Sequence, residues 1–343
     1  MKVFFRDGQK KHNPDNFLVM GNIHPNPEVP ERADALLSAA TSSGLDLETP
    51  ELCGLGPIAA IHNPAYLEFL RTIHAQWSNV PGAGPEVIPN IHPNRLSPDA
   101  VITSPAGLAG LYMADTACPI SADTWGACLE SASCAVAAAE TVLDGAKESY
   151  ALCRPPGHHA FADMAGGFCF LNNSAIAAQV LRSRHDRVAI LDVDVHHGNG
   201  TQGIFYRRSD VLTVSIHRDP VAYYPFYWGH AHEFGEADGH GCNLNLPLPK
   251  GSGDEVFLEA LETALKRITA FAPGALVIAL GLDAHESDPL RGLRVTTDGF
   301  ARIAEEIGKM NLPTVLVQEG GYLNEALGAN LSSALKGFMA KRC

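Results

Sequence analysis

Four short segments of the chain carry side chains that bind metals or move protons. They are residues 154–159 (RPPGHH), 192–200 (DVDVHHGNG), 281–285 (GLDAH) and 319–322 (EGGY). Each segment follows a hydrophobic run that is typical of a buried strand. Because ligands bind outside the carboxyl ends of strands in an open parallel sheet, we expect all four segments to meet at one rim.

Asp194 and His196 are two residues apart, so in an extended segment both side chains point to the same side. Asp283, at the end of another strand, could supply a third ligand. Three protein ligands and one open position are typical of a catalytic zinc site. An ordinary acidic loop with a hydrogen-bonded histidine would explain Asp194 and His196 alone. It does not explain the additional carboxylate and the nearby histidine pair.

The adjacent imidazoles of His158 and His159 are candidates for proton transfer beside a metal ion. Each ring needs an acceptor that orients it, and Asp192 and Asn199 are available for that task. Tyr322 follows two glycines, and its hydroxyl could donate to a developing oxyanion. Taken alone, Tyr322 is explained as simply by a plain glycine turn.

The elements that position these residues alternate between strand-like and helical patterns. This alternation predicts an α/β fold, with a single open, mostly parallel sheet covered by helices on both faces. The predicted strands are Val3–Phe5, Ser149–Leu152, Val188–Leu191, Val211–Ile216, Leu276–Leu280 and Thr314–Val317. The predicted helices are Glu31–Ser42, Thr124–Leu143, Asn173–Arg184, Asp254–Phe271 and Asp298–Lys309.

The composition narrows the function classes. The chain has 343 residues and a net charge of −13, which disfavours nucleic acid as a partner and suits a cationic ligand. Its 8 cysteines form no C-x-x-C pair, as expected of reduced thiols in a cytoplasmic protein. The N-terminus reaches charge too early for a signal peptide. The longest uncharged apolar stretch, residues 273–282, is about half of a membrane span.

The segment from Trp77 to Pro119 does not fit the alternation, because it holds seven prolines and almost no periodic pattern. A long irregular segment in a compact domain is usually functional or part of an interface. The alternative is a surface loop without a function.

In combination, these motifs resemble the histone deacetylase superfamily of zinc-dependent amidohydrolases with the arginase–deacetylase fold. The resemblance rests on R-P-P-G-H-H-A, L-D-V-D-V-H-H-G-N-G-T-Q, G-F-C-F-L-N-N and E-G-G-Y, and it extends from about residue 1 to residue 338. It implies one catalytic domain over residues 1–343 with an insertion at about 77–119. Among members, the bacterial acetylpolyamine amidohydrolases are the most similar, since they carry a comparable proline-containing insertion.

The resemblance implies a role for each residue of the site. Asp194, His196 and Asp283 would bind one Zn²⁺. His159 would act as general base and then as acid for the leaving amine, beside His158 paired with Asp192. Tyr322 would donate to the oxyanion. A structural K⁺ behind the zinc would be held by Asp192, Asp194, His196, Ser215 and Ile216.

The substrate-binding residues that the resemblance implies are less uniform. Gly167, Phe168 and Tyr224 match the walls of a tunnel for an aliphatic stem. Asp115 matches one of two acids that meet a distal ammonium, whereas the other position falls near Ser104, which has no charge. Leu290 stands where a polyamine-specific relative carries a glutamate. Alternatively, Asp115 only caps a turn before Pro119.

The resemblance therefore implies an amidohydrolase that removes an acetyl or other acyl group from a slender cationic amine, an acetylpolyamine above all. The alternative substrate is an acetyl-lysine side chain. Two further readings are a binuclear manganese ureohydrolase and a non-catalytic protein that binds acylated ligands. We expect a cytoplasmic homodimer, without nucleic acid or membrane as partner. It would be joined through the insertion, where Trp77, Ile88, Ile91 and Leu96 offer apolar contacts.

Overall fold

One parallel sheet organises the computed structural model of this chain, which describes residues 1–93 and 101–340. Within these residues the sheet has eight strands in the order β4-β1-β5-β10-β9-β6-β7-β8, and every neighbouring pair is parallel. The strands are β1 (Lys2–Phe4), β4 (Asp46–Glu48), β5 (Glu148–Ala151), β6 (Val188–Asp192), β7 (Val211–Arg218), β8 (Asn243–Leu248), β9 (Ala275–Leu280) and β10 (Thr314–Gln318).

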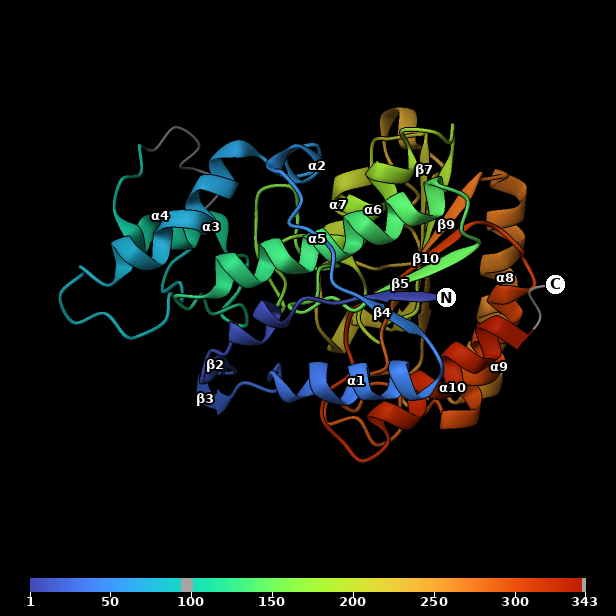
Figure 1. Cartoon of the computed structure of the whole chain (residues 1–343). Coiled ribbons are helices and arrows are strands. Elements are labelled where there is room, and N and C mark those ends of the chain that lie inside the picture. The colour runs from blue at the N-terminus through green and yellow to red at the C-terminus, as the bar shows by residue number, and fades with distance from the viewer. Residues whose placement is uncertain (94–100, 341–343) are drawn as a thin grey trace.

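Helices cover both faces of the sheet (Figure 1). One face packs against α1 (Glu31–Ser42), α8 (Asp254–Phe271), α9 (Thr297–Gly308) and α10 (Leu327–Ala340). The other face packs against α5 (Thr124–Leu143) and α6 (Asn173–Leu181), and α3 (Pro64–Trp77) extends the same hydrophobic core beyond the sheet. Shorter elements are α2 (Leu55–Ala59), α4 (Pro105–Tyr112), α7 (Asn199–Phe205), three 3₁₀ turns (Asp7–Lys11, Pro220–Ala222, Ala237–Gly239) and an antiparallel hairpin of β2 (Asn16–Val19) and β3 (Asn22–Pro25).

Two hydrophobic cores result, one on each side of the sheet. Along β6, Ala189 and Leu191 belong to the core under α8 and α9, whereas Val188 and Ile190 belong to the core under α5 and α6. Because both faces are buried, the strand is apolar up to Asp192 and shows no polar alternation. Each buried side chain of this size contributes about 1.5–3 kcal/mol to stability, which fixes the strand ends that carry the site.

The predicted α/β fold with a parallel sheet and helices on both faces is confirmed. All six predicted strands and all five predicted helices are present, although α6 ends at Leu181 rather than Arg184. The sequence patterns did not reveal the two edge strands, because β4 has only 3 residues, two of them acidic, and β8 contains two asparagines and a proline.

Segment 77–119 is less irregular than predicted, because it contains the helix α4. Proline at its first turn and Ser104, whose Oγ accepts a hydrogen bond from Gly107 N, start this helix. In Figure 1, α3 and α4 lie together at the end of the molecule farthest from α8. Leu96 lies outside the described residues.

Among the described helices, only α5 is long and apolar enough to cross a membrane. Of its apolar window, 61% is buried inside the fold. Its alanines pack against the sheet in the core shared with α6, as expected of a core helix.

Candidate active site

The four segments singled out in the sequence meet at the carboxyl ends of β5, β6, β9 and β10. The hydrogen bonds between them are buried and join residues that are far apart in the sequence. Gly320 N donates to Asp194 Oδ2 at 2.8 Å, and Val195 N donates to Asp283 Oδ1 at 3.0 Å. A Cβ on Gly320 would lie 2.2 Å from Asp283 Oδ2, so only glycine permits this approach to the carboxylates.

Asp194, His196 and Asp283 form a compact buried group. One potential ligand atom of each lies within 4.8 Å of the others. His196 Nδ1 is 3.1 Å from Asp194 Oδ1 and 3.2 Å from Asp283 Oδ2. Both carboxylates are 0% exposed, and among the described residues neither forms an ion pair with a lysine or arginine. Burial, followed by the charge of Asp194, raises the pKa of Asp283 to about 6.

These three residues fit a metal ion. Asp283 Oδ2 is buried and has no hydrogen-bond partner within the described part of the chain, although it faces His196 Nδ1. Leaving a buried carboxylate oxygen unpaired is costly, and a cation bound there would remove the cost. Imidazole nitrogen and carboxylate oxygen are both zinc ligands, and three protein ligands leave the open position that a catalytic zinc site keeps.

His158 faces two carboxylates. Its Nδ1 lies 2.9 Å from Asp192 Oδ2, and its Nε2 lies 3.9 Å from Asp194 Oδ1. Burial alone would lower the pKa of His158, but the charges of Asp194 and Asp192 outweigh it and raise the pKa well above its usual value. Asp192 Oδ1 also accepts from Asp194 N at 3.0 Å, which ties this pair to the metal-binding group.

His159 has a neutral partner instead. Its Nδ1 lies 2.6 Å from Asn199 Oδ1. The amide oxygen only accepts, so Nδ1 carries the proton and Nε2 keeps the lone pair. Burial, and then the neighbouring His158 and His196, lower the pKa of His159 well below its usual value. The ring is therefore neutral and can take up a proton at Nε2.

Tyr322 is 3% exposed, and burial raises the pKa of its hydroxyl well above the usual value, so the hydroxyl keeps its proton. Its ring contacts Phe168 edge to face, with 5.8 Å between the centroids. The guanidinium of Arg32 lies over the other side of the ring, 4.8 Å from the centroid. Asp288 Oδ2 accepts from Tyr322 N at 3.0 Å and holds the backbone at this point.

Gly167 and Phe168 both have a left-handed backbone, with φ of 50° and 66°. A Cβ on Gly167 would lie 2.5 Å from the His159 ring and 2.7 Å from the Tyr224 hydroxyl. The Tyr224 ring contacts the His159 ring edge to face at 4.8 Å. These predicted wall residues therefore lie directly against the candidate base.

A cavity of about 480 Å³ opens next to this wall. We call it the mouth cavity. It is lined by Leu18, Val19, Met20, Ala114, Asp115, Thr116, Ala117, Phe161, Asp163, Met164, Asn199, Tyr224, Pro225, Phe226, Tyr227 and Trp228.

Asp115 lies in the mouth cavity, as predicted for a substrate-binding residue, but its carboxylate is engaged within the protein. It accepts from Tyr224 Oη at 2.6 Å, from Gly167 N at 3.1 Å and from Ala117 N at 2.8 Å. The last of these is the turn interaction that we considered as the alternative. Ser104 does not line the cavity, because it caps α4.

Leu290 contributes backbone contacts near the metal-binding group. Its carbonyl accepts from Tyr223 Oη at 3.2 Å, and its N–H donates to Asp288. It is not a lining residue of the mouth cavity. Tyr223 itself was missed in the sequence: its ring stacks on His196 at 4.9 Å with an interplanar angle of 6°, and Arg218 covers its other face.

Ser215 lies opposite Asp192 in the β6–β7 register, and its Oγ is 2.8 Å from His217 Nδ1. Asp192 and Ser215 also line a small cavity of about 10 Å³. The residues expected to hold K⁺ are thus neighbours around the end of β6, where Ile216 continues β7.

Glu319 is the most consequential residue that the sequence analysis left without a role. Its carboxylate accepts from Gly157 N at 2.6 Å, His158 N at 3.0 Å and Ser174 Oγ at 2.6 Å. Glu319 thus fixes the backbone that carries the two histidines. Together with His158 and Cys169 it forms a second compact group of potential ligands, but its oxygens are already satisfied.

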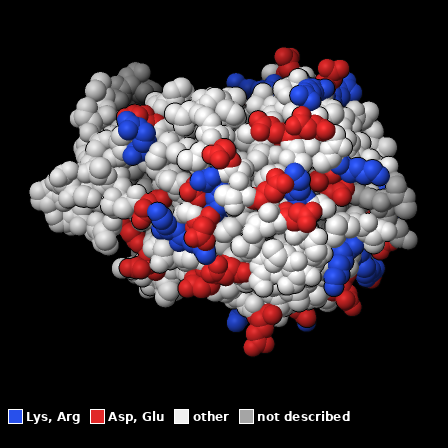
Figure 2. Space-filling view, viewed as in Figure 1, with Lys and Arg blue, Asp and Glu red and all other residues white. Residues whose placement is uncertain are grey.

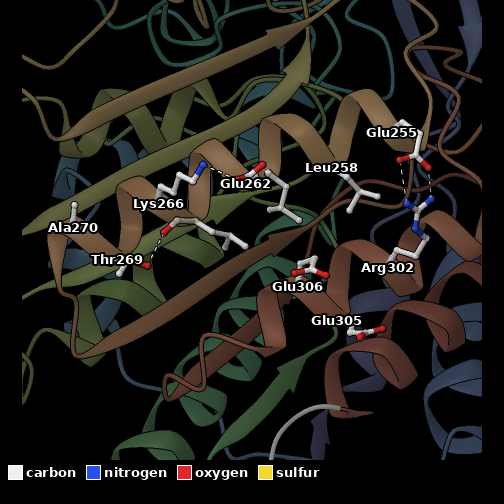
Figure 3. A pocket seen from close by; sticks show the side chains of 11 residues that line it. Glu255, Leu258, Glu262, Lys266, Thr269, Ala270, Arg302, Glu305 and Glu306 are labelled. Carbon is white, nitrogen blue, oxygen red and sulfur yellow. Dashed lines mark hydrogen bonds and ion pairs between the residues drawn. The ribbon is translucent and has the colours of Figure 1, made fainter.

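A second hollow lies between α8 and α9, away from the strand ends, with a volume of about 820 Å³ (Figure 3). Leu258, Leu261 and Leu265 line its floor. The ion pairs Arg302–Glu255 and Lys266–Glu262 lie along its edges. None of the candidate metal-binding or proton-transferring residues of the active site lines this hollow.

Comparison with known proteins is consistent with this geometry. The model of the histone deacetylase domain matches residues 26–338. An acetylpolyamine amidohydrolase from Burkholderia pseudomallei is 48% identical over 100% of both chains. Acetylpolyamine amidohydrolase 1 from Pseudomonas aeruginosa is 45% identical over 98% of this chain and 99% of the relative. The crystal structure of an acetylpolyamine aminohydrolase from Burkholderia pseudomallei superposes with a TM-score of 0.96 at 48% identity, covering 99% of each chain.

Proposed function

The chain belongs to the histone deacetylase family, and from this premise we propose that it hydrolyses the acetyl amide of acetylated polyamines. The observation that carries the proposal is that three groups of side chains meet at the carboxyl ends of the strands. They are the metal-binding group of Asp194, His196 and Asp283, the neutral ring of His159, and the tyrosine Tyr322. Relatives that match over the full chain length support acetylpolyamines as the substrate class.

The residues of the chain divide the work of amide hydrolysis. His159 Nε2 takes a proton from the attacking water and returns it to the leaving amine. His158, cationic beside Asp192, stabilises negative charge that develops next to it. The Tyr322 hydroxyl, which keeps its proton, donates to the oxyanion of the tetrahedral intermediate.

Asp194, His196 and Asp283 would hold one zinc ion per chain, as expected in a family that is zinc-dependent. When bound, zinc supplies a Lewis acid that polarises the amide carbonyl and lowers the pKa of water. We further propose a structural K⁺ held by Asp192, Asp194, His196, Ser215 and Ile216. The adjacent ends of β6 and β7 support this placement.

The charge of the mouth cavity favours a cationic amine. Asp115 and Asp163 both line it, without a lysine or arginine among its lining residues. An acetyl-lysine side chain is the second candidate, since it is as slender as an acetylpolyamine. A manganese ureohydrolase needs bridging carboxylates for a second metal about 3.5–4 Å away. Among the described residues, the other candidate metal group has its carboxylate satisfied by hydrogen bonds.

A rate comparison tests the proposal. Zinc-loaded protein is assayed for amine release from acetylputrescine, acetylcadaverine, acetylspermidine and an acetyl-lysine peptide, with Tyr322→Phe as the control of strongly reduced activity. We expect the highest kcat/KM on acetylated di- and polyamines. A clear preference for the peptide would assign the acetyl-lysine function. Arginine hydrolysis with two manganese ions per chain would assign the ureohydrolase function.

We also propose that residues 1–343 form one catalytic domain and that the insertion at 77–119 joins two copies into a homodimer. Ile91 and Val101 in this segment are 64% and 93% exposed. Figure 2 shows few charged side chains at the end of the molecule that holds α3 and α4. Light scattering tests this: Ile91→Asp should yield monomers, whereas a wild type that is monomeric at assay concentration would refute the dimer.

The remaining proposals concern location and partners. All seven cysteines of the described residues are free, which supports a reducing compartment such as the cytoplasm. The net charge of −13 and the mixed surface charges in Figure 2 do not favour nucleic acid as a partner. We also propose that the protein has no membrane partner, because the one apolar helix of sufficient length among the described residues, α5, packs in the hydrophobic core.

A further inference from the structure

The mouth cavity holds a carboxylate that the family motifs do not single out. Asp163 lines the cavity together with Asp115, Phe161, Tyr224 and Trp228. It lies between the catalytic His159 and the wall residue Gly167 in the sequence. Two acids therefore face the space through which a cationic substrate would pass.

The two acids differ in what their oxygens do. Both oxygens of Asp115 accept hydrogen bonds, Oδ1 from Ala117 N and Oδ2 from Tyr224 Oη and Gly167 N. The negative charge of Asp115 is thus used to hold the tunnel wall next to His159. Asp163 is exposed, and within the described residues its carboxylate has no hydrogen bond or ion pair.

The turn that carries Asp163 is fixed by the backbone. Phe161 N donates to Met164 O at 2.9 Å, which closes the turn around Asp163. Asn63 N donates to Ala162 O at 2.7 Å and ties the turn to the start of α3. A carboxylate on a fixed turn loses little conformational freedom when a ligand binds.

Aromatic rings next to Asp163 add to its attraction for an ammonium group. Phe161 and Trp228 contact each other edge to face, with centroids 5.4 Å apart, and both line the cavity. Tyr227, also in the lining, is 86% exposed. A cation is attracted to the face of such rings, and the attraction increases as it loses water.

We propose that Asp163 is the carboxylate that meets the distal ammonium of an acetylated diamine or polyamine, and that Asp115 acts instead as a positioning residue for Tyr224 and Gly167. This inference rests on the proposed function. The contact of Asp163 with the ammonium is the same in the ground state and the transition state. It therefore lowers KM for cationic substrates without changing kcat.

The test compares two substrates with the same four-carbon chain, acetylputrescine and the neutral N-butylacetamide, which lacks only the terminal ammonium, in zinc-loaded Asp163→Asn. We expect KM for acetylputrescine to rise about two- to fivefold, the range of an exposed ion pair, with kcat nearly unchanged. KM for N-butylacetamide, measured as a substrate or as a competitive inhibitor, should change far less. High salt should raise the wild-type KM for acetylputrescine and have less effect on the variant.

Two further variants keep the test specific. Asp186→Asn removes an exposed aspartate just before the amino end of β6, opposite the strand ends that carry the site, and should leave both KM values unchanged. Asp115→Asn should impair both substrates to a similar degree, because it alters the wall beside His159. Equal losses on both substrates in Asp163→Asn, or no loss on acetylputrescine, would overturn the inference. If the wild type hydrolyses no acetylated amine, the proposed function itself fails.

Discussion

Oδ1 of Asn199 lies 2.6 Å from Nδ1 of His159, whereas the adjacent His158 is paired with the carboxylate of Asp192 at 2.9 Å. Two neighbouring imidazoles thus have partners of different charge. The pKa of His159 is lowered by burial and by the two nearby rings, while that of His158 is raised by its carboxylates. Because their environments separate the two pKa values, the neutral ring of His159 is assigned as the base and the ring of His158 as the cation.

Replacing Asn199 by aspartate should move the pH dependence of the reaction. A carboxylate at this position stabilises the imidazolium and raises the pKa of His159. The base is active only when neutral, so the acidic limb of kcat/KM should move to higher pH, by about one unit or more. The pH profile of Asn199→Asp with acetylputrescine measures this. An unshifted acidic limb would remove the assignment of His159 as base.

Tyr322→Phe should lower kcat by about 10²–10³-fold, the usual loss for one oxyanion donor. The ring contacts with Phe168 and Arg32 persist in phenylalanine, so the loop should keep its position. Zinc content, measured by atomic absorption, should therefore equal that of the wild type. A variant with full kcat would show that the hydroxyl takes no part in the reaction.

Asp283→Ala should lower zinc content as well as rate, because it removes one of three ligands. Exhaustive chelation of the wild type should abolish turnover, and added zinc should restore it. His285→Ala is the matched control, since His285 follows in the same segment but lies outside the metal-binding group. Full activity in protein shown to be free of metal would contradict a zinc-dependent function.

Much of the site could be predicted because its residues are close in the sequence to strand ends. Asp194 and His196 follow β6 directly, and the spacing alone places them on one side. Asp288 and Glu319 could not be given roles in this way. Each acts on the backbone of a distant segment, at Tyr322 N and at Gly157 and His158 N, and no pattern of residue types encodes such contacts.

The fold was predictable where burial is greatest. The central strands β6, β9 and β10 are buried and consist mainly of consecutive apolar residues, so their runs stand out. The edge strands β4 and β8 are partly polar, since one side of each faces no further strand, and β4 has only 3 residues. The helix α4 lay hidden in a proline-rich segment, where Ser104 and the following proline are start signals that also occur in turns.

Glu319 gives the last prediction, which concerns stability rather than rate. Burial raises the pKa of this carboxyl to about 7, against a value of about 4.3 in an unfolded chain. Between these values the folded protein binds the proton that the unfolded chain releases, so stability falls as pH rises towards about 7. Above about pH 7 Glu319 is charged in both the folded and the unfolded chain. The free-energy cost of burying its charge then remains in full and no longer changes with pH.

Glu319→Gln removes this titration and keeps the hydrogen bonds, because an amide oxygen can accept from Gly157 N and His158 N while the amide nitrogen donates to Ser174. In metal-free protein, the Tm difference between variant and wild type should therefore favour the variant more at about pH 8 than at about pH 5. Glu325→Gln, an exposed glutamate six residues further on, should give the same difference at both pH values. A Glu319→Gln protein whose Tm difference does not depend on pH would mean that Glu319 is already charged in the folded protein at about pH 5, and the raised pKa would be wrong.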